Sequence, residues 1–209
     1  MKFDHLPRSR VSIDNHSFIL IPKCASTSIE QAMIRNKAIF SFELPASDEK
    51  FFAVIRNPLD RWITGVHQYI KDNISGRYNL FMETMHFIKD GNIIFDEHTL
   101  PMTYFLYPFR TYHIKYIHMN KDMITNINEW SRMNLTDKPM NQSIHNNHVD
   151  NGVRYILESI AQTDNFLKRF EHVYRDDIKL FHDGELEFTE KYDNDIVAYN
   201  IETQGFKYA

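Results

Sequence analysis

The sequence predicts an α/β fold: a three-layer sandwich in which helices flank a central, mainly parallel sheet. Two apolar runs, at residues 17–21 and 50–55, have the length of buried strands, and each leads into an amphipathic helical stretch. Strands that alternate with helices tend to pair in parallel and to be covered on both faces. We expect a single domain over residues 1–209, with a core at about 15–182 and a C-terminal tail at 183–209.

The remaining elements follow in order along the chain. The residues before 17 are expected to be an irregular lead-in, and the first strand is followed by a helix at 28–36. After the second strand, Asn57 is a typical N-cap and Pro58 a typical first helical residue, which predicts a helix as far as residue 71. Apolar periodicity then predicts a helix at 77–90, a strand at 113–118, a helix at 122–133, and two helices within 152–181 that separate near 163–164.

Composition and charge narrow the class of protein. The net charge is −4 and the isoelectric point about 6.2, which argues against a nucleic-acid-coating protein but not against a local cationic site. The single cysteine, Cys24, excludes an internal disulfide and a thiol-rich metal site. We expect a cytoplasmic protein, because no segment resembles a signal peptide and no run approaches the roughly 20 apolar residues of a membrane span.

The stretch FILIPKCASTSIE, which begins at Phe18, combines a strand end, a turn of small residues and a helix start. Backbone amides at a helix N-terminus lack helical partners and attract anions. The small residues let the backbone approach a phosphate, and the lysine adds a full positive charge. The residues predicted to form this phosphate site are Lys23, Cys24, Ala25, Ser26, Thr27 and Ser28, the last two of which can also cap the helix. The alternative is a capped helix after a strand, with an exposed lysine.

This turn differs from a Walker A loop. That motif, G-x-x-x-x-G-K-[ST], contains glycines and places its lysine late. Here the lysine comes first and no glycine is present. A nucleotide kinase therefore remains only an alternative function.

The second motif is FFAVIRNPLDRWITG, in which Arg56 follows the second strand. Ligands of open α/β sheets bind beyond the carboxyl ends of the strands, where both motifs fall. Arg61 and Thr64 are three residues apart on the next helix and so share a face. A guanidinium fork and a hydroxyl suit a terminal phosphate. For Arg61, the alternative is an ion pair with Asp60 or a solvent-facing position.

Together, IPKCASTSI and AVIRNPLDRWITG resemble the sulfotransferases that use 3'-phosphoadenosine 5'-phosphosulfate (PAPS), most closely their carbohydrate branch. The first motif is similar to the family's 5'-phosphosulfate loop. The second is similar to its 3'-phosphate segment, in which a serine follows the arginine by eight positions. Weaker similarities are HTLPMTYFL at 98–106, MNQSIH at 140–145 and VYRDDIKLF at 173–181. The resemblance implies a P-loop-NTPase-like fold, with PAPS as donor and 3'-phosphoadenosine 5'-phosphate (PAP) as product.

The resemblance also implies roles for individual residues. Lys23 would bridge the 5'-phosphate and the sulfuryl group, and would stabilise the leaving group of an in-line displacement. The backbone of residues 24–28 would wrap the 5'-phosphate, while Arg56 and Thr64 would hold the 3'-phosphate, with Arg61 as a further donor-binding candidate. Ala25 stands where the family has a glycine, although alanine does not favour a strongly positive φ.

The acceptor implied by the resemblance is a hydroxyl, with a carbohydrate as the leading class, and it must lose a proton to a base. Glu43 and His98 are the joint candidates for this base, and His67 is an alternative. No metal is required: His145 and His148 have a suitable spacing, but no third or fourth ligand is evident. A non-catalytic nucleotide-binding module is a competing function. Neither a nucleic acid nor a membrane is an expected partner, and the sequence leaves the oligomeric state open.

Overall fold

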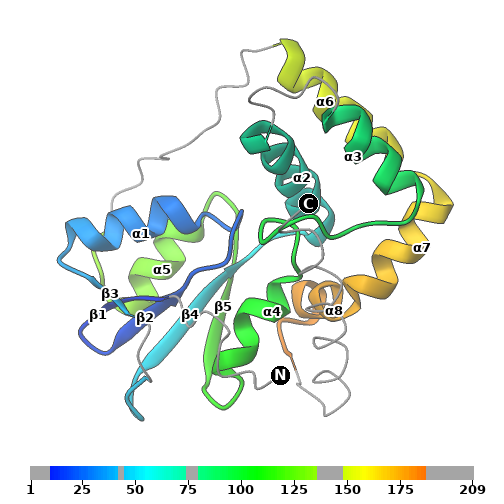
Figure 1. The fold of residues 1–209 in the computed structure, drawn as a ribbon. Coiled ribbons are helices and arrows are strands. Elements are labelled where there is room, and N and C mark those ends of the chain that lie inside the picture. The colour runs from blue at the N-terminus through cyan, green and yellow to red at the C-terminus, as the bar shows by residue number, and fades with distance from the viewer. Residues whose placement is uncertain (1–9, 42–44, 74–79, 136–147, 187–209) are drawn as a thin grey trace. The chain divides into compact units, whose positions relative to one another are not determined.

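A computed structural model describes residues 10–41, 45–73, 80–135 and 148–186 of the chain (Figure 1). The chain divides into two compact units, each built from two segments. The sheet unit comprises Met1–Arg56 and Met102–Ile144, and the helical unit comprises Asn57–Pro101 and His145–Ala209. The α/β class expected from the sequence is confirmed, whereas the single domain stays a prediction.

The sheet has five strands in the order β3-β1-β2-β4-β5. They are β1 (Arg10–Ile13), β2 (His16–Ile19), β3 (Ile39–Ser41), β4 (Lys50–Ile55) and β5 (Ile114–His118). β4 runs parallel to both β2 and β5, whereas β1 pairs antiparallel with both β2 and β3. The sheet is therefore mixed, and the prediction of a mainly parallel sheet is wrong.

A tight hairpin produces the antiparallel part of the sheet. Ile13 pairs with His16, so only Asp14 and Asn15 form the turn, and Asp14 adopts a φ of 52°. Aspartate tolerates this left-handed backbone because its short polar side chain can hydrogen-bond locally. Within the expected irregular lead-in, residues 10–16 thus form β1, a turn and the first residue of β2. A strand of 4 residues is too short for its period to stand out in the sequence.

β4 lies inside the sheet, and its residues 51–55 are all buried, as its uninterrupted apolar run requires. Its side chains alternate between faces: the Phe51 ring contacts Phe109, and the Phe52 ring contacts Phe18 and Trp130. The helical elements of this unit are α1 (Ser26–Arg35), α4 (Met102–Leu106), the short 3-10 helix η2 (Tyr107–Phe109) and α5 (Met123–Ser131). Trp130 belongs to α5 and Phe109 to η2, so helical elements flank the sheet.

The helical unit has a core of its own. Its helices are α2 (Pro58–Asn73), α3 (Leu80–Lys89), α6 (His148–Ile160), α7 (Asp164–Val173) and α8 (Arg175–Asp183). Trp62 of α2 is fully buried against Phe166 and Phe170 of α7. Its indole Nε1 donates a hydrogen bond to the Ile93 carbonyl at 2.7 Å, so this buried polar group has a partner.

The predicted helix pair at 152–181 is three helices in the structure. A second break falls at Tyr174, whose backbone leaves helical geometry between α7 and α8 (φ −104°, ψ 18°). The Tyr174 ring stacks on Phe170 at 4.3 Å between centroids, and its hydroxyl donates to the Thr99 carbonyl. These tertiary contacts have no signal in the local sequence. Among the helices of the described residues, none combines the length and the apolar composition that crossing a membrane requires.

Candidate functional site

The phosphate loop predicted from the sequence joins β2 to α1 in the sheet unit. Its backbone is left-handed at two residues that carry side chains: Lys23 has a φ of 64°, and Ala25 has a φ of 58° and a ψ of 17°. Ala25, which stands where the similar family has a glycine, thus adopts a conformation that alanine does not favour. Turns that alternate in handedness direct successive amides to one side and make concave anion sites.

Two contacts hold the middle of this loop. The Cys24 amide donates to the Ile21 carbonyl at 3.2 Å, which closes the turn. The Cys24 side chain is fully buried, with its Sγ 3.7 Å from the Sδ of Met102. Cys24 is therefore an anchor of the loop, because its thiol is buried and its amide is bound within the turn.

The first turn of α1 supplies the remaining predicted phosphate contacts. Helix α1 begins at Ser26, and its N-cap is Ala25. Thr27 and Ser28 therefore lie within the first turn, and the prediction that they cap the helix is wrong. No acidic residue occurs in this turn, and Ala25 offers no side-chain cap. The first amides of any helix lack an i−4 partner, and the helix dipole is positive at this end. The turn is therefore suited to an anion.

Arg56 lies beside this loop. It follows β4, and β2 and β4 are parallel neighbours, so the loop and Arg56 both lie at the carboxyl edge of the sheet. Arg56 Nη1 donates to the carbonyl oxygen of Lys23 at 3.3 Å. The two motifs, 33 residues apart in sequence, are thus in direct contact.

The other two residues of the second motif belong to α2 in the helical unit. The Asn57 side chain caps this helix as predicted, accepting from the amides of Leu59 and Asp60 at 3.0 and 3.1 Å. Arg61 is fully buried and its Nη1 donates to the Leu100 carbonyl, so it does not face solvent. Thr64 Oγ1 donates to the Asp60 carbonyl at 2.8 Å. Donor binding by Arg61 and Thr64 stays a prediction.

His98, a candidate base, is held by Asp96 within the helical unit. One Asp96 carboxylate oxygen lies 2.9 Å from His98 Nδ1, and the other accepts from the His98 amide at 2.9 Å. Thr99 Oγ1 accepts from the Asp96 amide and so closes the same turn. An imidazole whose Nδ1–H faces a carboxylate keeps Nε2 as a proton acceptor. Asp96 was not among the predicted site residues, although the pattern D-E-H-T, with a carboxylate two residues before a histidine, could have indicated it.

We do not assign a metal site to the turn that contains Asp96 and His98. Asp96, Glu97 and His98 offer ligand atoms that lie within 4.8 Å of one another. Glu97 is exposed, however, and the Asp96 carboxylate already binds His98. The other proposed base, Glu43, lies outside the described residues, as do the 140–145 segment and the side chain of His148.

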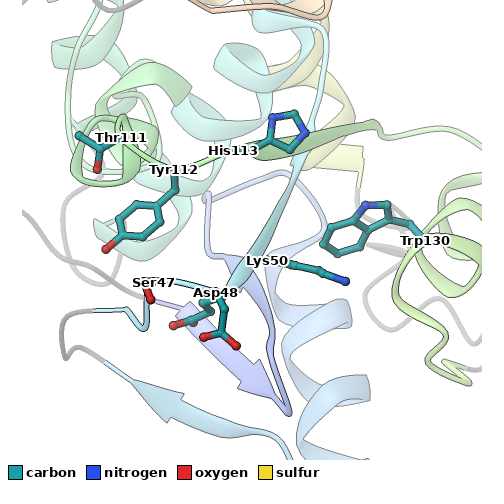
Figure 2. Close-up of a pocket in the computed structure, with 8 residues that line it drawn as sticks. Ser47, Asp48, Lys50, Thr111, Tyr112, His113 and Trp130 are labelled. Carbon is teal, nitrogen blue, oxygen red and sulfur yellow. The ribbon is translucent and has the colours of Figure 1, made fainter.

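A hollow of about 440 Å³ lies at the opposite, amino-terminal edge of the sheet (Figure 2). It is lined by Ser47, Asp48, Glu49, Lys50, Thr111, Tyr112, His113 and Trp130. Lys50 begins β4 and His113 precedes β5, whereas the phosphate loop follows the end of β2. The hollow is therefore separate from the contact between Lys23 and Arg56.

Glu49, in the wall of this hollow, forms a buried ion pair. Arg10 Nε donates to Glu49 Oε1 at 2.8 Å, and the Ser17 hydroxyl donates to the same oxygen. Burial alone raises the pKa of Glu49, but these hydrogen bonds outweigh it and leave the pKa below its ordinary value. Glu49 is thus an ionised structural group that joins β4 to β1 and β2.

Comparison with known proteins gives no relative: no family model, no curated protein and no solved structure matches the chain.

Proposed function

We propose that this protein is a sulfotransferase that moves a sulfuryl group from PAPS to a hydroxyl acceptor, with a carbohydrate as the leading acceptor class. The observation that carries the proposal is the hydrogen bond between Arg56 and the Lys23 carbonyl. It joins the loop similar to the family's 5'-phosphosulfate loop to the arginine similar to its 3'-phosphate ligand. A nucleotide with phosphates at both ends of its ribose needs cationic groups at two such adjacent points.

The surroundings of the loop support the same donor. A strand leads into a turn with two left-handed residues, and then into a helix with no acidic residue in its first turn. This arrangement suits a phosphate bound by backbone amides rather than by a metal ion. The proposed P-loop-like fold rests on β2, the loop, α1 and the parallel neighbour β4.

The chemistry is an in-line displacement at sulfur. The acceptor oxygen forms a bond to sulfur as the bond to the phosphate oxygen breaks, and negative charge builds on the departing PAP. The Lys23 ammonium and the amides of the first α1 turn would stabilise that charge. The acceptor proton passes to a base, for which His98, oriented by Asp96, and Glu43 are the candidates.

Calorimetric binding of PAP, with ATP and AMP as controls, tests the donor site. We expect micromolar binding of PAP that depends on the 3'-phosphate. PAP binding should be lost in Lys23→Ala, because this variant removes the positive charge of the Lys23 ammonium from the loop. Arg35→Ala, which removes an exposed cation from the last turn of α1, is the matched control and should bind normally. Absence of PAP binding, or equal binding of ATP, would exclude a PAPS-dependent enzyme.

Turnover separates the enzyme from a non-catalytic nucleotide-binding module. PAP release from PAPS would be followed with a panel of glycan acceptors for wild type, Glu43→Gln and His98→Asn. Loss of a general base lowers turnover by roughly 10²–10⁴-fold while PAP affinity is retained. If PAP binds and no acceptor in the panel supports turnover, the non-catalytic module is favoured.

A further inference from the structure

Arg56 binds the loop at a residue whose backbone is constrained. Its Nη1 donates to the carbonyl oxygen of Lys23 at 3.3 Å, and Lys23 has a φ of 64°. Arg56 is partly buried and directly follows β4. The hydrogen bond therefore joins a central strand of the sheet to the loop itself.

This contact holds one end of a peptide plane whose other end is also held. The Lys23 carbonyl and the Cys24 amide belong to the same planar peptide unit. Arg56 binds the oxygen, and the Cys24 amide donates to the Ile21 carbonyl at 3.2 Å. Fixing both ends determines the direction of the turn that leads to Ala25 and to the first amides of α1. A change at Arg56 should therefore alter the loop even when no ligand is bound.

An arginine can bind two partners at once. The guanidinium carries five N–H donors in a fixed fork, so one can bind a carbonyl while others bind an anion. We propose that Arg56 is a positioning residue for the 5'-phosphosulfate loop as well as a 3'-phosphate ligand, and that it couples the two phosphate sites. This inference rests on the proposed function for the identity of the ligand.

The coupling has a consequence for donor choice. A 3'-phosphate bound to Arg56 restricts the guanidinium and so strengthens its hold on the Lys23 carbonyl. The 5' end of PAPS then meets a loop that is already ordered, and less conformational freedom is lost on binding. A nucleotide without the 3'-phosphate lacks both the direct contact and this ordering.

Amide hydrogen exchange at Cys24 and Ile29, whose amides donate to the Ile21 and Ala25 carbonyls, tests the positioning role in the ligand-free wild type, Arg56→Ala and Arg35→Ala. We expect exchange about tenfold faster in Arg56→Ala, as loss of a charged hydrogen bond implies. Arg35→Ala removes the same charge from an exposed site and should leave the loop unchanged. Unchanged exchange in α5 would show that Arg56→Ala retains the fold of the sheet unit.

Binding of AMP, which has a 5'-phosphate and no 3'-phosphate, is measured on the same variants. A positioning residue predicts that Arg56→Ala weakens AMP binding about tenfold as well as PAP binding. If loop exchange is unchanged and only PAP binding falls, Arg56 is a phosphate ligand alone and the inference is overturned. If wild type binds no PAP, the proposed function fails, while the exchange experiment still decides the positioning role.

Discussion

Lys23 and Ala25 hold a backbone conformation that costs roughly 1–2 kcal/mol each for residues with a Cβ. Such strain persists only where neighbouring contacts hold it, and it concentrates at functional sites. Here the holding contacts are the Cys24 hydrogen bond to Ile21 and the Arg56 hydrogen bond to Lys23. The strain lies in the backbone that we propose for the 5'-phosphate.

Ala25→Gly should therefore stabilise the protein. Glycine adopts a φ of 58° without a Cβ penalty, and the gain should exceed its entropic cost by about 1 kcal/mol. The measurement is the urea midpoint of unfolding. Ala32→Gly, at a buried position inside α1, is the control and should destabilise by about 1 kcal/mol or more. Equal destabilisation by both substitutions would contradict the strained geometry at Ala25.

Sequence reasoning predicted the positions of these residues better than their conformations. Strand ends and small residues were enough to place Lys23 and Arg56 at one edge of the sheet. The left-handed backbone at Ala25 could not be predicted, because it depends on contacts from Ile21 and Arg56 rather than on a local preference. The pairing of Asp96 with His98 depends likewise on the fold of one turn.

At the scale of elements, α2 lies very close to the turn that holds His98. A Cβ added to Gly65 of α2 would clash with the His98 carbonyl oxygen and would lie 3.2 Å from Cγ2 of Thr99. Real Cβ atoms do not approach a backbone oxygen so closely, so either the helix or the turn would have to move. Gly65 thus allows α2 and this turn to pack in direct contact.

Gly65→Ala should destabilise the protein although alanine favours helices. The clash with backbone costs about 1–3 kcal/mol or more, which exceeds the roughly 1 kcal/mol gained in helix propensity. Gly152→Ala on α6 is the matched control: its added Cβ would meet nothing within 4 Å, so it should stabilise by up to about 1 kcal/mol. The measurement is the thermal unfolding midpoint of both variants. A higher midpoint for Gly65→Ala than for wild type would refute the close packing.

Elements with strong local signals were predicted well. The apolar run KFFAVI coincides with β4, and α2 begins at Pro58 after its Asn57 cap. The strand at 113–118 and the helix at 122–133 are observed with small shifts as β5 and α5. β1 and the separate α8 were missed, because a short strand and a break enforced by tertiary contacts leave little trace in a local pattern.

At the scale of the whole molecule, Glu49 and His16 link folding to pH. The pKa of Glu49 lies below its ordinary 4.5 despite burial, because Arg10 and Ser17 hydrogen-bond its carboxylate. The pKa of His16 lies below its ordinary 6.5, first because of burial and then because of Lys50. The folded protein thus favours ionised Glu49 and neutral His16, and protonation of either group opposes folding.

Stability should fall in two steps as the pH is lowered. The His16 contribution is lost as the pH falls from about 6.5 towards the lower folded pKa, and the Glu49 contribution is lost below about 4.5. Urea unfolding from about pH 8 to about pH 3 measures both contributions. His16→Gln should remove the upper step. Glu49→Gln should lower stability at neutral pH by about 1–3 kcal/mol, because the buried Arg10 then faces a neutral amide instead of a carboxylate, and should remove the lower step.

The outcome that would contradict this linkage is stability that stays constant from pH 8 to about pH 5 in wild type. If Glu49→Gln still loses stability below about pH 4.5, carboxylates other than Glu49 cause the acid sensitivity.

The buried position of Cys24 also allows the protein to report on the loop between β2 and α1. The sequence contains one cysteine, and its thiol is covered where the loop packs near Met102. A thiol reagent can reach it only when that packing opens, so the labelling rate of the native protein measures the frequency of loop opening. No engineered probe is needed, and a nucleotide that orders the loop will slow the reaction in proportion to its occupancy.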